Sequence, residues 1–147
     1  MKIQNRISVV DKARVADLTT LKNTQEKFLE KNLKAYAQVA SEMKKADKEY
    51  VKTKEAYTNE DSKINAHYYT VARNALNECV NEFNALTQNI NNTIDSLKVV
   101  YENLNAAVAV VDAEKAAKQA NDFYHFNDKI SAKINKVKNS LAGYPHY

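Results

Sequence analysis

Apolar residues recur along the first part of the chain at steps of three and four, the spacing of one face of an α-helix. From Tyr36 to Tyr57 the steps alternate as in the a and d positions of heptads, which predicts a helix over about 8–57 that pairs with a partner helix. Around Asn32 the register slips by one residue, which predicts a locally relaxed supercoil in an unbroken helix. The apolar stripe consists of Ile3, Ile7, Val10, Leu18, Leu21, Phe28, Tyr36, Val39, Met43, Ala46, Tyr50 and Tyr57.

A second stripe with the same spacing predicts a helix over about 63–111. Residues 58–62 lie between the two stripes, contain no apolar residue and are rich in capping and turn formers, so the chain is expected to reverse there. Asparagines are dense in the second stripe and favour either a solvated helix face or a break near 89–93; the apolar spacing favours the unbroken helix. The second stripe consists of Ile64, Tyr68, Val71, Ala75, Cys79, Phe83, Leu86, Ile90, Ile94, Leu97, Tyr101, Leu104, Val108 and Val111.

A third apolar pattern follows over 112–141, where Asp112 can cap a helix and Gly143 can end it, leaving a tail at 142–147. No glycine or proline marks a turn at 112, so continuation of the second helix is favoured over a fold-back. A continuing helix would carry an apolar face past the end of the hairpin. That uncovered face is expected to be a binding surface.

The composition supports a helical fold, because the chain has one glycine and one proline among 147 residues, both within the last five. Sheet folds need such residues at their tight turns. The prediction is an all-α fold: one elongated domain built as a long antiparallel two-helix coiled-coil hairpin with a C-terminal helical extension. One cysteine forms no internal disulfide, and the apolar run Ala106–Val111 is far shorter than the roughly 20 residues of a membrane span, so a cytoplasmic protein is expected.

Candidate chemistry is sparse. General acid–base catalysis needs titratable groups in a pocket, and phosphate binding needs glycine-rich loops, so no enzyme, catalytic residue or cofactor is predicted. Asp122, His125 and Asp128 could approach one another, but their spacing drifts off one helix face and the preferred interpretation of His125 is a contact residue, with no metal site. Cys79 lies on the second stripe and is interpreted as a core residue.

Charge is unevenly distributed, with net values of +5, −3 and +2 over residues 1–57, 58–111 and 112–147. Opposite charges on the two arms favour their pairing modestly. Four lysines of 129–141 surround an apolar face, so a weak membrane-surface contact through 129–141 stays an alternative to packing or partner binding. A mild overall excess of +4 does not indicate a specific nucleic-acid site.

The layout resembles the FliJ/YscO family, the stalk proteins of the flagellar and type III secretion export apparatus. The similarity rests on an apolar and basic opening (Ile3, Arg6, Ile7, Val9, Val10, Lys12, Arg14) and on the Ala- and Lys-rich residues 113–118 leading to Phe123. It implies a cytoplasmic stalk, at the inner face of a membrane-bound machine, that inserts its paired helix ends into a hexameric export ATPase, promotes its assembly and contacts the export gate or chaperones.

The partner-binding residues expected from the resemblance and from the uncovered face are Ile3, Arg6, Ile7, Val10, Lys12, Arg14, Lys115, Lys118, Phe123, Phe126 and Ile130. Two other classes remain open. The chain could be a self-associating structural or assembly coiled coil of a virus or phage particle, or a helical effector or inhibitor that binds a partner protein. Because both arms carry a stripe, the pattern fits pairing within one chain and pairing between chains, and the oligomeric state stays open.

Overall fold

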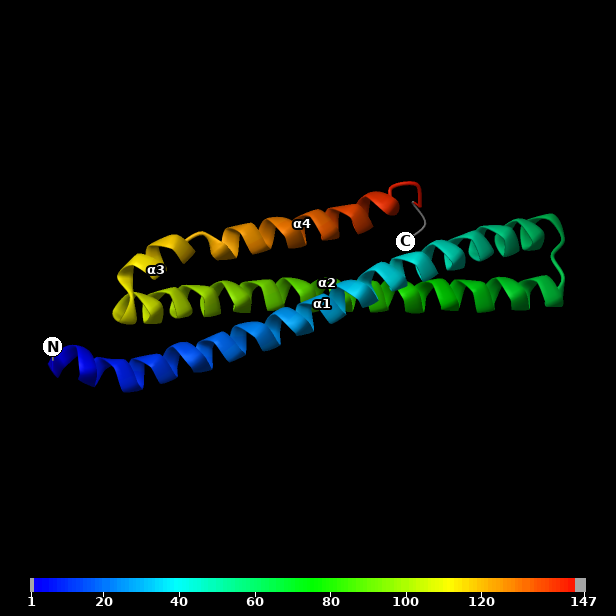
Figure 1. Ribbon diagram of the computed structural model, residues 1–147. Helices are drawn as coiled ribbons and strands as arrows, with labels where there is room; N and C mark the ends of the chain where they lie inside the picture. The colour runs from blue at the N-terminus through cyan, green and yellow to red at the C-terminus, as the bar shows by residue number, and fades with distance from the viewer. Residues whose placement is uncertain (1, 145–147) are drawn as a thin grey trace. The chain divides into compact units, whose positions relative to one another are not determined.

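The protein is described by a computed structural model that gives the backbone of residues 2–144 and the side chains of residues 9–144. Four helices account for nearly all of it: α1 (Lys2–Asn59), α2 (Lys63–Val111), α3 (Ala113–Gln119) and α4 (Asp122–Ser140) (Figure 1). Residues 2–144 contain no strand. α1 and α2 pack together as an antiparallel hairpin, followed by C-terminal helices, which confirms the predicted fold class.

The turn between α1 and α2 is made by Glu60–Ser62 without a glycine. Ser62 caps α2, because its Oγ accepts a hydrogen bond from the Asn65 N–H at 3.1 Å. The Asn65 side-chain amide donates to the carbonyls of Glu60 at 2.9 Å and Ala56 at 3.3 Å, and so ties the start of α2 to the turn and to the end of α1. The turn lies where the sequence predicts it, with Thr58 and Asn59 still helical.

The chain forms two compact units. The first unit comprises the chain up to Lys31 together with Ile90–Ala132, and the second comprises Asn32–Asn89 together with the chain from Lys133. α1 and α2 each pass through both units, so each unit contains a stretch of the hairpin and a stretch of the C-terminal helices.

The second unit is held by aromatic packing between α1 and α2. The Tyr36 and Phe83 rings stack with centroids 4.5 Å apart and planes 15° apart. Nearer the turn, the Tyr69 ring lies 5.7 Å from that of Tyr50 and 5.6 Å from that of Tyr57. Such ring pairs add about 0.5–1.5 kcal/mol each beyond the area they bury.

Tyr36→Phe is expected to stabilise the protein. The Tyr36 side chain is 1% exposed, and its hydroxyl has no hydrogen-bond partner within the described part of the protein. An unsatisfied buried polar group costs about 1–3 kcal/mol, so removing it while keeping the stacked ring should raise the free energy of unfolding by about 1 kcal/mol. Urea unfolding of the two proteins measures the difference. A loss of stability would show that the hydroxyl is hydrogen bonded.

The first unit has its core where three helices meet. Leu104, Val108 and Ala116 form a buried cluster, and Val15 and Leu18 pack against it. α1, α2 and α3 therefore all contribute to one core.

The C-terminal helices fold back in the first unit, so the favoured continuation of the second helix is wrong. Asp112 leaves the helix at φ −153° and ψ 93°, and its Oδ1 accepts a hydrogen bond from the Lys115 N–H at 3.0 Å. Aspartate competes well for backbone donors, so it ends one helix and caps the next without a glycine or proline. In Figure 1, α3 and the start of α4 run back beside α2.

Two parts of the predicted stripes lie on the wrong face. Leu21 and Phe28 are 43% and 51% exposed, and the buried residue between Leu18 and Tyr36 is Leu29. With Leu29 in place of Phe28, the step to Tyr36 is a full heptad, and the register slip lies instead between Leu18 and Leu29, which are eleven residues apart.

At the start of α2 the predicted stripe is displaced by one residue. Ile64, Tyr68 and Val71 are more than half exposed, while their neighbours Ala72 and Leu76 are buried. The asparagine-rich stretch, in contrast, follows the favoured prediction. α2 passes through residues 89–93 without a break, and Ile90 is 1% exposed.

Candidate interaction site at the start of α1 and the end of α2

The candidate site is a cleft in the first unit, formed where α1 begins and α2 ends. A hollow of about 240 Å³ is lined by one group of apolar and charged side chains. These are Lys12, Val15, Val108, Val111, Asp112 and Lys115. The cleft thus joins residues that are nearly 100 positions apart in the sequence, and the core cluster of Leu104, Val108 and Ala116 fixes its floor.

Four exposed valines lie at the same two helix ends, and one of them, Val111, lines the cleft. Val9 and Val10 on α1 are 74% and 73% exposed, and Val110 and Val111 on α2 are 57% and 38% exposed. Isolated exposed apolar residues are normal on a protein surface, but several at one end of a helix pair are a feature of interaction sites. We call these four residues, together with Lys12 and Lys115, the valine–lysine patch.

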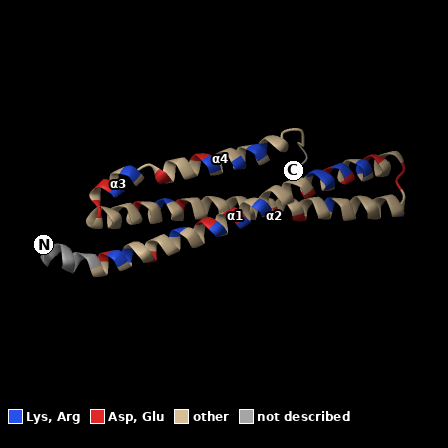
Figure 2. Ribbon diagram, in the orientation of Figure 1, with Lys and Arg blue, Asp and Glu red and all other residues tan. Residues whose placement is uncertain are grey.

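Neighbouring carboxylates offset the two lysines of the patch. In the sequence, Asp11 lies close to Lys12 and Arg14. Lys115 and Lys118 are likewise flanked by three acidic residues, Asp112, Glu114 and Asp122. Figure 2 shows acidic and basic residues mixed at the start of α3. The Lys118 Nζ and Glu114 Oε1 are 3.8 Å apart in an exposed i,i+4 pair, which contributes little stability. Recognition here would depend on apolar contact.

Tyr101 on α2 contacts side chains of both α1 and α4. Its hydroxyl donates a hydrogen bond to the Glu26 carboxylate of α1. The Lys22 Nζ lies 5.3 Å from the ring centroid of Tyr101, and the Phe123 and Phe126 rings lie at 5.5 and 5.9 Å. Burial, followed by the hydrogen bond to Glu26, raises the pKa of the Tyr101 hydroxyl above its ordinary value.

Tyr101→Phe is expected to change the alkaline limit of stability. The folded protein holds the phenol proton more tightly than the unfolded chain, whose tyrosine pKa is about 10. The stability that the protein gains from this raised pKa is fully present below pH 10 and is lost as the pH rises above it. Tyr101→Phe should cost about 1–2 kcal/mol at neutral pH through the lost hydrogen bond, and its stability should fall less steeply above pH 10. Unfolding at pH 7–11 measures both effects, with Tyr124→Phe as the matched control; parallel curves for all three proteins would contradict the prediction.

The predicted partner-binding residues are not all exposed in the structure. The side chains of Ile3, Arg6 and Ile7 lie outside the described residues. Val10, Lys12, Arg14, Lys115 and Lys118 are exposed in the first unit, and Lys12 and Lys115 line the same cleft. The cleft therefore brings one residue of the predicted N-terminal group, Lys12, close to one residue of the predicted 113–118 group, Lys115.

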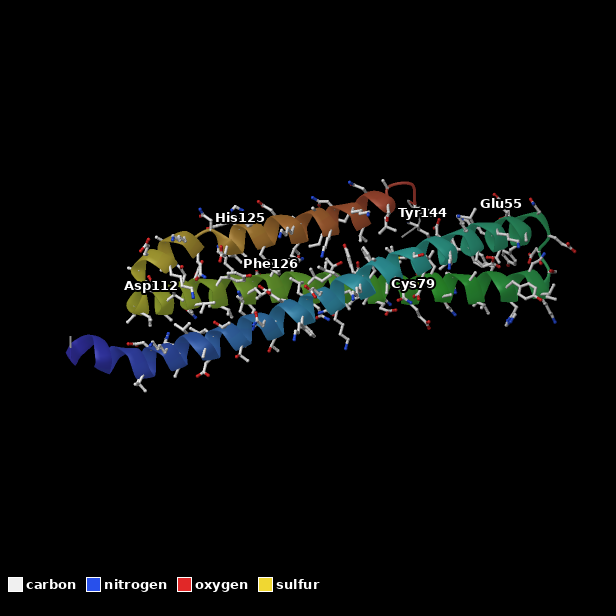
Figure 3. All side chains as sticks on the ribbon, viewed as in Figure 1. Glu55, Cys79, Asp112, His125, Phe126 and Tyr144 are labelled. Carbon is white, nitrogen blue, oxygen red and sulfur yellow. The ribbon has the colours of Figure 1, made fainter. Side chains whose placement is uncertain are left out.

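Phe123, Phe126 and Ile130 lie on a covered face. Both phenylalanines are half-buried against Tyr101, and Ile130 is 2% exposed. In Figure 3, Phe126 lies on the side of α4 toward α2 and His125 on the opposite side. The expectation of an uncovered apolar face on 112–141 is wrong, because the fold-back at Asp112 brings this face onto the chain's own interior.

Sequence reasoning missed three residues of the site. Lys22 and Glu26 are polar residues at helix positions that face inward, so a search for apolar residues passes over them. Val110 lies off the predicted stripe, next to Val111, which was expected to be inside the hairpin. The run of apolar residues at 106–111 is wider than one helix face needs, and this was the available signal.

Other candidate chemistry is weakly supported. Among the described residues, no group of three or more His, Cys, Asp and Glu side chains is placed to hold a metal ion. Asp122, His125 and Asp128 are all exposed. Cys79 is half-buried, and burial, followed by the charges of nearby glutamates, raises the pKa of its thiol. None of the described helices is long and apolar enough to cross a membrane.

Comparison of the chain with protein-family models, with curated proteins and with solved structures found no match.

Proposed function

We propose that this chain is a non-enzymatic helical interaction protein that binds a partner protein through the valine–lysine patch. The observation that carries the proposal is that four valines, 38–74% exposed, lie at the start of α1 and the end of α2, where Val111 and the core residue Val108 line one cleft. Exposed apolar side chains on a fixed surface lose little conformational entropy on binding, which favours a specific contact. Because neighbouring carboxylates offset the two lysines of the patch, the affinity should change little between low and moderate salt.

The specific form of this proposal is an export-apparatus stalk. In the FliJ/YscO layout the paired helix ends enter the ring of a hexameric export ATPase. The start of α1 and the end of α2 are the corresponding ends here, and both carry exposed valines. Such a stalk would work in the cytoplasm at the inner face of a membrane-bound machine. α3 and α4 are additional to a two-helix stalk and pack beside the cleft.

The test is binding to a purified hexameric export ATPase of the type III class from the same source. Mass photometry measures complex and ring assembly, and ATP hydrolysis is followed in parallel. The double variant Val10→Asp with Val110→Asp should weaken binding at least tenfold, because the charges must be desolvated at the interface. Val99→Asp is the matched control, since Val99 is 54% exposed on α2 in the same unit but lies eleven residues before Val110, away from the helix end.

Each outcome has a clear meaning. Binding by the wild type and the control but not by the double variant supports the stalk and the patch. Binding that is indifferent to all the variants would place the contact elsewhere on the chain. No binding by the wild type would overturn the stalk.

A further inference from the structure

The fold-back in the first unit depends on one non-helical residue. Asp112 alone separates α2, which ends at Val111, from α3, which begins at Ala113. The flanking residues are alanines and valines, and neither glycine nor proline lies nearby. Asp112 lies four residues from both Val108 and Ala116, so a continuous helix would put these three residues on one face. A small change at Asp112 therefore suffices to join α2 and α3 into one helix.

Two of the contacts across the fold-back are spaced symmetrically about Asp112. Val108 and Ala116, which share a core cluster, are each four residues from it. Tyr101 and Phe123, whose ring centroids are 5.5 Å apart, are each eleven residues from it. When two antiparallel copies of a straight helix cross at residue 112, they bring the same residues opposite one another. The pairing in the first unit is thus compatible with one chain or with two.

Two polar atoms in the interior of the first unit lack hydrogen-bond partners among the described residues, and few side chains of residues 113–132 are fully buried. Gln25 Oε1 and Asn105 Oδ1 are buried and have no hydrogen-bond partner within the described residues. Among residues 113–132, only Ala116 and Ile130 are fully buried. Short connections between elements that pack well are the features from which domain swapping arises.

We propose that a second copy of this chain can replace the fold-back in a domain-swapped dimer. Asp112 becomes helical, α2 joins α3, and residues 113–132 of each copy pack on residues 90–111 of the other. The contacts of Ala116 and Phe123 are kept, but they now join two chains. The exchange does not depend on the partner site proposed above, because it concerns the chain's own interior contacts.

Two substitutions at the hinge test the exchange in opposite directions. Asp112→Ala removes the cap on α3 and favours a continuous helix. Ala113→Pro is compatible with the closed form, because residue 113 is the first residue of α3, where proline is tolerated, and Asp112 already has the extended backbone that precedes proline. Proline at 113 cannot continue α2, since it lacks the backbone N–H and clashes with the preceding turn.

Wild type, Asp112→Ala and Ala113→Pro are refolded from denaturant at high protein concentration, and their masses are measured by light scattering during size exclusion. The wild type should form some species of twice the 16.7 kDa chain mass. Asp112→Ala should raise the dimer-to-monomer ratio at least tenfold, and Ala113→Pro should lower it at least tenfold. In a dimer of labelled and unlabelled copies, isotope-filtered NMR should show Tyr101–Phe123 contacts between chains.

The exchange is overturned by wild type and Asp112→Ala that both stay monomeric after refolding. It is also overturned by an Ala113→Pro protein that dimerises as well as the wild type, or by a dimer without contacts between Tyr101 and Phe123 of different chains. If Asp112→Ala does not fold, the comparison of Ala113→Pro with the wild type still decides the matter.

Discussion

Ile130→Ala is expected to lower the free energy of unfolding by about 2–5 kcal/mol, the usual range for emptying a buried aliphatic site. Ile130 is 2% exposed on α4, although it lies in the segment for which the sequence favours an uncovered helix. The loss is large, because small domains have only about 5–15 kcal/mol of stability in total. Denaturant unfolding followed by circular dichroism measures it.

Tyr124→Ala is the matched control for this prediction. Tyr124 lies on the same helix and is also a large side chain, but it is 59% exposed. Its replacement should change stability by no more than about 0.5 kcal/mol. Equal effects of the two substitutions would mean that α4 is not docked as described.

Leu97→Asp is expected to prevent stable folding. Leu97 is 0% exposed in the middle of α2, and a carboxylate there would lose its hydration without a compensating partner. We expect a loss of at least about 4 kcal/mol, or an unfolded protein at 25 °C. Leu97→Ala, with an expected loss of about 2–5 kcal/mol, gives a measurable value if the aspartate variant does not fold.

Two comparisons make this a test of the helix register. Val99→Asp, two residues away on an exposed face, should leave stability within about 1 kcal/mol of the wild type. Leu86→Asp should cost less than Leu97→Asp, because Leu86 is only half-buried. A tolerated Leu97→Asp would show that this face of α2 is turned to solvent.

The sequence predicts the hairpin well where apolar spacing and composition agree. Tyr36, Val39 and Met43 follow the heptad pattern, and all three are buried. The turn at Glu60–Ser62 follows from its capping residues. The absence of glycine and proline from the arms allows the long helices.

The sequence fails where polar residues occupy inward positions of a helix. On α1, Lys22 and Gln25 face the interior of the first unit, while Leu21 and Phe28 face outward. A method that follows only apolar residues chooses the wrong face there. Burial depends on the neighbouring helices, which a single sequence does not specify.

The fold-back could not be derived from the sequence for a second physical reason. A straight helix and a hairpin at Asp112 bring the same apolar positions together, in two chains or in one. The backbone conformation of Asp112 decides between them. Aspartate is a good helix cap, but it is also tolerated inside a helix with some loss of stability. For the same reason the structure brings Lys12 and Lys115 of the predicted site together but places Phe123 and Ile130 inside.

The most direct test of the fold-back is the proximity of Tyr101 and Phe123 in the purified monomer. The account predicts nuclear Overhauser effects between the two rings, whose centroids are 5.5 Å apart. A helix that continued through Asp112 would separate these residues by roughly 33 Å, at about 1.5 Å per residue. Cross-peaks between the rings in the monomer are the expected result; their absence, with helical chemical shifts running unbroken through Asp112, would contradict the fold-back.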